Sequence, residues 1–309
     1  MKIFVIGGTG MIGGHAARAM VAGGHDVTSL ARSDAAEAKL SASGIAAIRG
    51  DAEDRDALAT GIADAETVVF APSMGDAETA VVDWIIDHMA DSGKSLIFCS
   101  GTGVLGQRTG GTWSEDTFAE ADDFVPQRAI STRFMLEGRV RAASAKGLKR
   151  GIVVRPPAVW SHEQPHSLVT GVLDSVRKTG AACYIGQGLN MYTHIHAEDL
   201  GEVFRLVAES GQDGAVYHAV AGEIPNRWIA ETVARLTGAP TRSITIDEAI
   251  DLWGKFATLI VFSCSSRSRS PRTRTEFGWA PKHSDMLAAA EASVKALLAE
   301  NPIGEAVSA

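Results

Sequence analysis

The chain has 309 residues, of which 45% are hydrophobic and 21% are charged, a composition typical of a globular protein with a large buried core. Its formal net charge of −8 argues against a nucleic-acid partner, because binding to phosphate backbones depends on clustered Lys and Arg. The three cysteines, Cys99, Cys183 and Cys264, fit neither a disulfide framework nor a metal site, and no metal is expected.

No segment has the charged start, long apolar stretch and small-residue cleavage site of a signal peptide. No stretch reaches the roughly 20 apolar residues that a membrane span needs. We therefore expect a cytoplasmic protein without a membrane partner.

Short apolar runs alternate with helical patterns through the first half of the chain. Strands are expected at residues 3–6, 26–30, 46–49, 67–71, 96–99 and 151–155. Helices are expected between them at 12–22, 35–43, 54–61, 77–92 and 126–146. Short β-branched strands that alternate with helices predict a parallel sheet covered on both faces, with right-handed crossovers.

The alternation loosens after Arg155, where Pro156 and Pro157 interrupt the chain. Helices are expected at 167–179, 197–209, 227–236, 247–253 and 286–300, and short strands at 183–185 and 193–196. Residues 263–274 are polar and contain four arginines, which favours a solvated loop.

A glycine-rich turn joins the first strand to the first helix. Gly7 permits the tight turn, Gly10 lets the backbone approach a pyrophosphate, and Gly13 lets the helix pack closely on the strand. The free N–H groups at the helix start, from Met11 and Ile12 onward, would face the phosphates. The turn therefore predicts a bound dinucleotide.

The predicted fold class is α/β, a doubly wound parallel Rossmann sheet with a smaller C-terminal α/β substrate lobe. Residues 1–155 are expected to form the dinucleotide-binding domain, and residues 193–222 are expected to return to it. Residues 156–192 and 223–309 are expected to form the substrate lobe.

The turn has the spacing Gly-x-x-Gly-x-x-Gly, and its sequence, Gly-Gly-Thr-Gly-Met-Ile-Gly-Gly, resembles the extended short-chain dehydrogenase/reductase superfamily. That branch includes nucleotide-sugar epimerases and dehydratases and dihydroflavonol-type reductases. The resemblance covers most of the chain and extends to residues 50–54, 68–71, 153–160, 194–200 and 276–281. It implies an NAD(P)-binding oxidoreductase-like protein of the epimerase/dehydratase type with a small-molecule substrate.

The residues after the second strand bear on the choice of nicotinamide cofactor. Ala31 stands where a carboxylate would accept hydrogen bonds from the ribose of NAD, and Arg32 follows it. A guanidinium suits a phosphate, so NADP is favoured and NAD stays open; the alternative is that Arg32 is a solvated surface charge. The resemblance places further residues against the cofactor, namely Asp51, Ala52, Ala71, Pro72, Ser73 and Pro156. Asp51 could instead be a helix cap.

The catalytic residues usual for the superfamily are replaced here. The superfamily works with a Tyr-x-x-x-Lys pair and a Ser or Thr, and none of the three tyrosines precedes a lysine by four positions. The resemblance puts the Tyr position at Ala129, the Lys position at Arg133 and the Ser position at Gly101, with Ser100 and Thr102 on either side.

Three interpretations follow, and the sequence leaves open whether the chain is an enzyme. The favoured one is an NADP-dependent reductase with a non-standard acid/base, because a complete substrate lobe is retained. In it, Ser100 or Thr102 orients the substrate, Arg133 holds the ribose, and the proton donor is Tyr192 or one of three histidines, His162, His166 and His194. The alternatives are an inactive NADP-binding sensor or regulator and a non-redox isomerase or lyase.

Several residues of the second half have two interpretations. Trp160 could form a wall of the substrate site or be an ordinary buried aromatic, and His162 and His166 could contact substrate or lie in a surface loop. The resemblance gives His196 and Asp199 a structural role that ties the lobe to the sheet. It also allows the four arginines, Arg267, Arg269, Arg272 and Arg274, to grip an anionic substrate.

A homodimer is a further possibility. The predicted helices at 77–92 and 126–146 match those that form a four-helix dimer interface in much of the superfamily. Trp84, Ile85 and Met89 give the first of them an apolar face, which could equally pack on the chain's own sheet.

Overall fold

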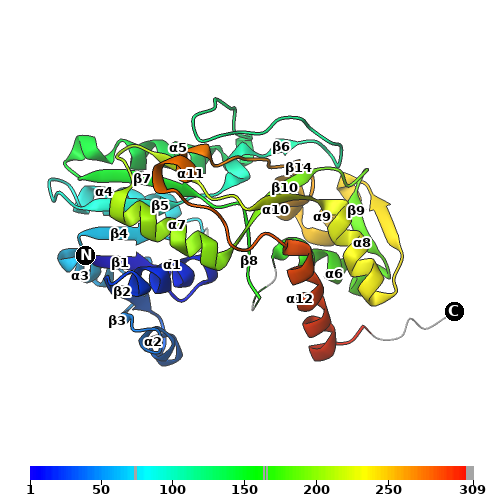
Figure 1. Ribbon diagram of the computed structural model, residues 1–309, viewed down its shortest axis with the longest axis horizontal. Coiled ribbons are helices and arrows are strands. Elements are labelled where there is room, and N and C mark those ends of the chain that lie inside the picture. Colours follow the sequence, from blue (N-terminus) through cyan, green and yellow to red (C-terminus); the bar gives the residue numbers. More distant parts are fainter. Residues whose placement is uncertain (73–74, 163, 165, 304–309) are drawn as a thin grey trace.

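A seven-stranded parallel sheet forms the larger part of the molecule (Figure 1). The computed structural model describes residues 1–72, 75–162, 164 and 166–303. The strand order is β11-β7-β5-β4-β1-β2-β3, and every neighbouring pair is parallel. The strands are β1 (Lys2–Ile6), β2 (Asp26–Ala31), β3 (Ala46–Arg49), β4 (Thr67–Phe70), β5 (Ser95–Cys99), β7 (Arg150–Arg155) and β11 (Val216–His218). The predicted doubly wound α/β fold is confirmed.

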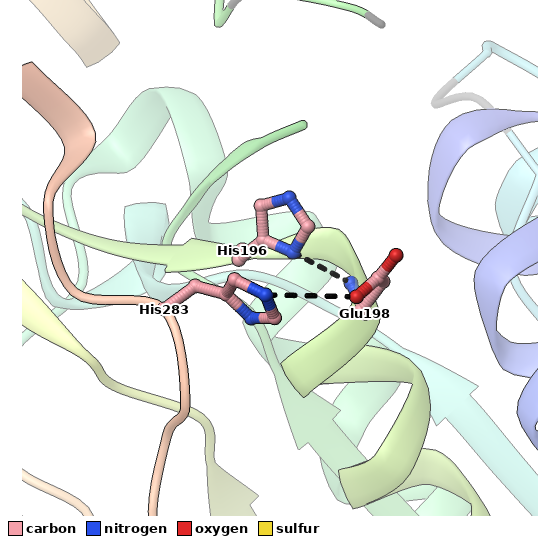
Figure 2. Close-up of side chains that lie close together, drawn as sticks. All are labelled: His196, Glu198 and His283. Atoms are coloured by element: carbon pink, nitrogen blue, oxygen red, sulfur yellow. Dashed lines mark hydrogen bonds and ion pairs between the residues drawn. The ribbon is translucent and has the colours of Figure 1, made fainter. Parts of the chain in front are cut away.

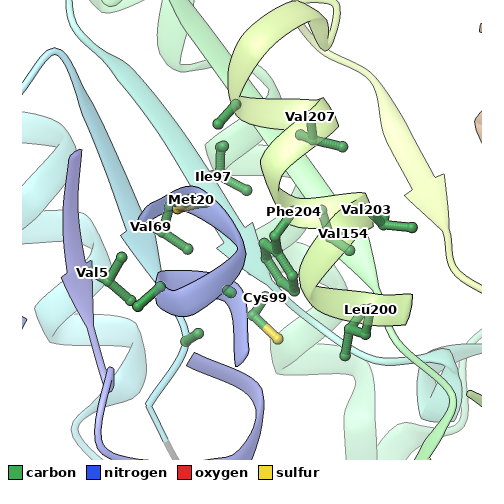
Figure 3. Close-up of a cluster of buried hydrophobic side chains, with 14 of the residues drawn as sticks. Val5, Met20, Val69, Ile97, Cys99, Val154, Leu200, Val203, Phe204 and Val207 are labelled. Atoms are coloured by element: carbon green, nitrogen blue, oxygen red, sulfur yellow. The ribbon is translucent and has the colours of Figure 1, made fainter. Parts of the chain in front are cut away.

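Helices cover both faces of this sheet because its strands carry apolar side chains on both sides. In β1, Val5 packs into one core and Phe4 into the other. The first core holds residues of α1 (Met11–Ala22), α2 (Asp34–Ser41) and α7 (Ala197–Ser210), and Figure 3 shows α1 and α7 over one face. The second core holds residues of α3 (Arg55–Asp64), α4 (Glu78–His88) and α5 (Ser131–Arg141).

A smaller lobe lies beside the sheet, on the side of α6, α8 and α12 in Figure 1. It holds a sheet of β12 (Gly222–Pro225), β10 (Met191–His196) and β8 (Ala158–Trp160), and a pair of β9 (Ala182–Ile185) and β13 (Thr241–Ile244). The helices α6 (Ser167–Thr179), α8 (Asn226–Thr237), α9 (Ile246–Trp253) and α12 (Met286–Glu300) contribute to its own core. The predicted helices at 167–179 and 286–300 are confirmed to the residue.

The segment between the two lobes crosses back and forth. After β10 in the small sheet, α7 packs beside α1, and a Cβ at Gly201 would lie 2.6 Å from the His15 carbonyl oxygen. The chain then adds β11 to the edge of the large sheet beside β7. It returns to the small sheet as β12, which pairs antiparallel with β10.

The predicted helix at 126–146 is wrong in its continuity. The structure has a 3₁₀ turn at Arg128–Ile130, then α5, then a second 3₁₀ turn at Ala143–Lys146. The backbone of Gly147, which follows, is left-handed with φ of 81°, and glycine adopts that conformation at little cost.

The predicted solvated loop at 263–274 is also wrong. This segment contains β14 (Cys264–Ser265), which pairs with β6 (Gln107–Arg108), and it begins α11 (Pro271–Phe277). Ser266, Ser268 and Ser270 are buried. The Ser266 N–H donates to the carbonyl oxygen of Met191 in β10. The backbone of a strand distant in sequence thus provides a hydrogen-bond partner for this buried polar segment.

Part of the apolar face of α4, which was a candidate dimer interface, packs against the chain's own core. Ile85 and Met89 are fully buried in the second core, which also holds residues of α3 and α5. Trp84 stacks on His88 and lies under the guanidinium of Arg55. Among the described residues, no helix is long and apolar enough to cross a membrane.

Candidate functional site

The glycine-rich turn after β1 is tightly packed. The backbone of Gly7 has φ of 100°, and a Cβ there would lie 2.5 Å from the Ala71 carbonyl oxygen. A Cβ at Gly13 would lie 2.4 Å from the Gly7 carbonyl oxygen. Gly10 begins α1 without any capping side chain. The N–H groups of the first helical turn have no acceptor within the helix, and such a helix start binds anions.

A cavity of about 680 Å³ opens at this turn and follows the carboxyl ends of β1 to β4. It lies where the strand order reverses between β1 and β4, which is the usual place for a ligand in such sheets. The predicted cofactor residues that line it are Gly7, Gly10, Met11, Ile12, Arg32, Asp51, Ala52, Ala71 and Pro72. The uncapped helix start at this cavity and its place at the switch point of the sheet fit a dinucleotide.

The other predicted cofactor residues lie elsewhere. Gly13 supports the turn from behind and does not line the cavity. The Pro156 carbonyl oxygen accepts the Thr102 N–H at 2.9 Å, and Pro157 lines the cavity in its place. Ser73 falls outside the described residues. Sequence reasoning missed further lining residues, among them Thr9, Leu30, Gly50, Val159 and Ser167.

Three charged residues, Arg32, Asp51 and Glu53, line the cavity. Arg32 is exposed and lines it, in agreement with a position open to a ligand. Asp51 also lines it, and its Oδ1 accepts the N–H groups of Glu53 at 2.8 Å and Asp54 at 3.1 Å. The residue that caps α3 is Asp54. Asp51 therefore shapes the loop before the helix and does not itself cap the helix.

A second cavity of about 290 Å³ adjoins the first, and Ile12, Ala71 and Pro72 line both. Its other walls come from the end of β5, the turn after it, α5 and the segment at 256–260. Gly101 and Arg133, which the resemblance puts at the family's Ser and Lys positions, both line it. Ala129, which the resemblance puts at the Tyr position, is exposed.

Arg133 is held in the wall of the second cavity by three interactions. Its guanidinium lies 3.1 Å from the Glu78 carboxylate, donates to the Cys99 carbonyl oxygen at 2.8 Å, and stands over the Phe98 ring. The Arg133 and Glu78 side chains are only 11% and 9% exposed. Burial raises the pKa of the Glu78 carboxyl, while the charge of Arg133 acts in the opposite direction. The Arg133 Nε is buried without a hydrogen-bond partner.

The candidate hydroxyl groups are placed differently from one another. Ser100 lines the second cavity, and its buried Oγ has no hydrogen-bond partner. Thr102 is fully buried, and its Oγ1 accepts a hydrogen bond from Ser266. Tyr192 is buried behind Gly103: a Cβ added to Gly103, which lines the cavity, would lie 3.5 Å from the Tyr192 Oη. Burial raises the pKa of Tyr192.

The candidate histidines are mostly neutral and enclosed. His166 lines the first cavity and caps α6 through its Nδ1, and burial lowers its pKa to about 4. Burial also lowers the pKa of His194 to about 4, and its Nδ1 accepts the Trp160 Nε1–H at 3.3 Å. Trp160 is 3% exposed and lies outside both cavities. His162 is exposed, edge-on to Trp160.

His196, Glu198 and His283 come together at the start of α7 (Figure 2). One ligand atom from each lies within 4.8 Å of the others, so in the described part of the chain they form a group that could hold a metal ion. Their present contacts are structural: the His196 Nδ1 accepts the Glu198 N–H, and the Asp199 carboxylate accepts the N–H of His283. The sequence did not reveal the group because His283 lies far along the chain.

The four arginines at 267–274 interact within the protein. The guanidinium of Arg267 donates to both oxygens of the Glu223 carboxylate at 2.9 Å. Arg269 donates to the Asp122 carboxylate. Arg272 donates to the Val216 carbonyl oxygen, and Arg274 donates to the Val220 carbonyl oxygen. None of the four lines either cavity.

Comparisons with known proteins agree with this geometry. The model of the NAD dependent epimerase/dehydratase family matches residues 3–221. An uncharacterized protein of Saccharomyces cerevisiae is 30% identical over 299 residues, which cover 93% of this chain and 97% of the relative. A 4-hydroxy-2-methyl-3-oxo-4-farnesyl-3,4-dihydroquinoline-1-oxide ketoreductase of Stigmatella aurantiaca is 26% identical over 72% of this chain and 69% of its own.

A solved structure similar to this chain is the dTDP-glucose 4,6-dehydratase of Bacillus anthracis in complex with NAD. Its TM-score is 0.74 at 16% identity, and the match covers 97% of each chain. The family match spans the glycine turn and all seven strands of the large sheet. The chain therefore belongs to the NAD-dependent epimerase/dehydratase family.

Proposed function

We propose that the protein is an NADP-dependent reductase that acts on the carbonyl group of a small molecule. The observation that carries the proposal is that the two cavities meet at Ile12, Ala71 and Pro72. A dinucleotide in the first cavity would thus end where the second begins. When bound, the reduced nicotinamide supplies a hydride to the carbonyl carbon, and the carbonyl oxygen takes a proton from the protein. The similarity to a ketoreductase supports this reaction type.

The chain's own residues would hold the cofactor along the first cavity. The start of α1 would bind the pyrophosphate, since its N–H groups are free of a capping side chain. Arg32 would bind a 2′-phosphate, for which its charge and planar fork are suited. At the inner end, the Nε–H of Arg133 would donate to the ribose, because it is the part of the guanidinium that lacks a partner.

Ser100 and Tyr192 would serve the carbonyl oxygen from two sides. The Ser100 hydroxyl, buried and unpartnered in the wall of the second cavity, would donate a hydrogen bond that orients the substrate. Tyr192 would donate the proton past Gly103, which lines the cavity and at which an added Cβ would lie 3.5 Å from the Tyr192 Oη. Because burial raises its pKa, Tyr192 carries its proton at neutral pH. Thr102 would support Ser266 and not touch substrate.

The reaction is tested by NADPH oxidation with a panel of aldehydes and ketones, alongside NADPH binding measured by fluorescence. We expect turnover, and we expect Tyr192→Phe to lower kcat by about 100-fold or more without weakening NADPH binding. Ser100→Ala should lower kcat/KM, because the substrate loses a hydrogen bond. Binding of NADPH without turnover of any carbonyl would favour a sensor or regulator instead.

The cofactor preference is tested separately. NADPH should bind more tightly than NADH, and Arg32→Ala should remove most of the difference. Arg242→Ala, which removes an exposed arginine from β13 in the other lobe, is the matched control and should keep the preference. Tighter binding of NADH by the unmodified protein would refute the role given to Arg32.

A further inference from the structure

We propose that the second cavity accepts an uncharged, largely apolar aldehyde or ketone and rejects anionic substrates, nucleotide sugars included. The proposal rests on the proposed function for the reaction, and it adds the class of substrate. The walls of the cavity, its charges and its rim each support it.

The walls of the second cavity are mainly hydrocarbon. Apolar side chains line it from four separate segments, with Ile12 from α1, Val104 after β5, Ile130 before α5 and Ile260 after α10 (Lys255–Ala257). Only 6% of the surface of Ile130 and 5% of that of Ile260 is exposed, so both residues are packed firmly in the protein. Ligand sites of this kind bind through apolar contact and use a few polar groups to fix orientation. The Ser100 hydroxyl is placed to be such a group.

The charge in the wall is already neutralised. Of the described residues that line the second cavity, only Arg133 is charged, and the Glu78 carboxylate lies 3.1 Å from its guanidinium. An anionic group in the cavity would therefore meet no unpaired cation. The Glu78 carboxylate offsets the attraction that the Arg133 charge would exert on an anion.

The arginines that the sequence offers for anion binding do not supply the missing charge. The guanidinium groups at 267, 269, 272 and 274 contact carboxylates and carbonyl oxygens of the protein and lie outside the cavity. Moving a carboxylate or phosphate from water into an apolar cavity without a partner costs several kcal/mol. A discrimination of at least about 100-fold between neutral and anionic substrates follows.

The rim of the cavity offers a place to alter this preference. Phe256 in α10 lines the cavity and is 53% exposed, so its replacement leaves the core intact. An arginine at this position would bring a solvated cation to the mouth of the cavity. Phe256→Leu keeps an apolar rim and is the matched control.

The experiment compares 4-methylbenzaldehyde with 4-carboxybenzaldehyde, which carry the same reacting group and differ in charge. With NADPH, we expect kcat/KM to be at least 100-fold higher for the neutral aldehyde. We expect Phe256→Arg to reduce that ratio at least 10-fold and Phe256→Leu to keep it. Equal kcat/KM values for the two aldehydes, or a rise in Tm with UDP-glucose, would overturn the inference and leave the proposed reaction standing.

Binding of unreactive analogues separates this inference from the proposed reaction. In the presence of NADPH, whose nicotinamide ring is uncharged, 4-methylbenzamide should bind at least 100-fold more tightly than 4-carboxybenzamide, measured by calorimetry. If neither aldehyde is reduced but the neutral amide binds selectively, the reaction fails and the substrate class stands. Equal binding of both amides, or binding of neither, would refute the apolar site.

Discussion

The pair of Arg133 and Glu78 allows a test that separates holding the fold from serving the site. Both side chains are about one-tenth exposed, and Arg133→Met would leave the Glu78 carboxylate in a buried position without its cation. Breaking a fully buried ion pair costs about 3–5 kcal/mol. Because the pair keeps some solvent contact and Glu78 can take up a proton, we expect Arg133→Met to lose about 2–3 kcal/mol of unfolding free energy at pH 7.5.

The loss should depend on pH in a defined direction. The pKa of Glu78 is already raised by burial, and removal of Arg133 removes the charge that lowers it. A carboxyl whose folded pKa lies above its unfolded value destabilises the folded state as pH rises through that interval. The stability lost in Arg133→Met should therefore be smaller at pH 5 than at pH 7.5, as measured by urea unfolding.

The double variant Arg133→Met, Glu78→Gln decides between the two roles. Removal of both charges from a buried site is often nearly neutral, so we expect its unfolding free energy to return to within about 1 kcal/mol of the unmodified protein. Its kcat/KM for an aldehyde should nevertheless stay at least about 10-fold low, because the Arg133 donor is absent. Recovery of kcat/KM together with stability would show that Arg133 serves the fold alone and would refute its role at the ribose.

Gly13→Ala should weaken NADPH binding at least 10-fold and lower the Tm, because the new Cβ would lie 2.4 Å from the Gly7 carbonyl oxygen. Gly138→Ala is the control and should do neither, because a Cβ at Gly138 would meet no atom within 4 Å. The pKa of His194 is lowered to about 4 in the folded protein, so the unfolded chain takes up this proton first and stability falls as pH drops below about 6.5. We expect His194→Asn to remove about 2 kcal/mol of the stability loss between pH 7.5 and 5. An unchanged pH profile of the unfolding free energy would contradict this. Dialysis against EDTA should leave the Tm unchanged, since His196 in the cluster already accepts a backbone N–H; a Tm that falls and is restored by Zn²⁺ would indicate a structural metal.

Local patterns of the sequence predict most of the large sheet. Strand β1 alternates side chains between two cores, and its apolar run is visible directly. The helix Met286–Glu300 is also predicted to the residue, because its apolar spacing needs no partner to be recognised. The cofactor cavity follows as well, since the residues that line it come from the loops after successive parallel strands.

Features that depend on contacts between distant segments are the ones that the sequence does not reveal. Ser266 and its neighbours have the composition of a solvated loop, yet the backbone of β10 satisfies them in the interior. Phe256 and Ile260 reach the second cavity from the small lobe, and nothing in their local pattern marks them as lining residues. His283 joins the start of α7 only through tertiary packing.

The positions that the resemblance assigns to the family's catalytic residues illustrate both sides of this division. The resemblance predicts positions, and two of the residues at those positions, Gly101 and Arg133, line the second cavity. The resemblance does not say which side chain would do the work of the family's tyrosine, and Ala129 is exposed. The Tyr192 hydroxyl, which the proposed function takes as the acid, belongs to β10 in the small lobe and lies behind Gly103, a residue that lines the cavity. If that hydroxyl is the acid, the proton and the cofactor are held by different lobes, and catalysis depends on how the lobes pack as much as on the glycine turn.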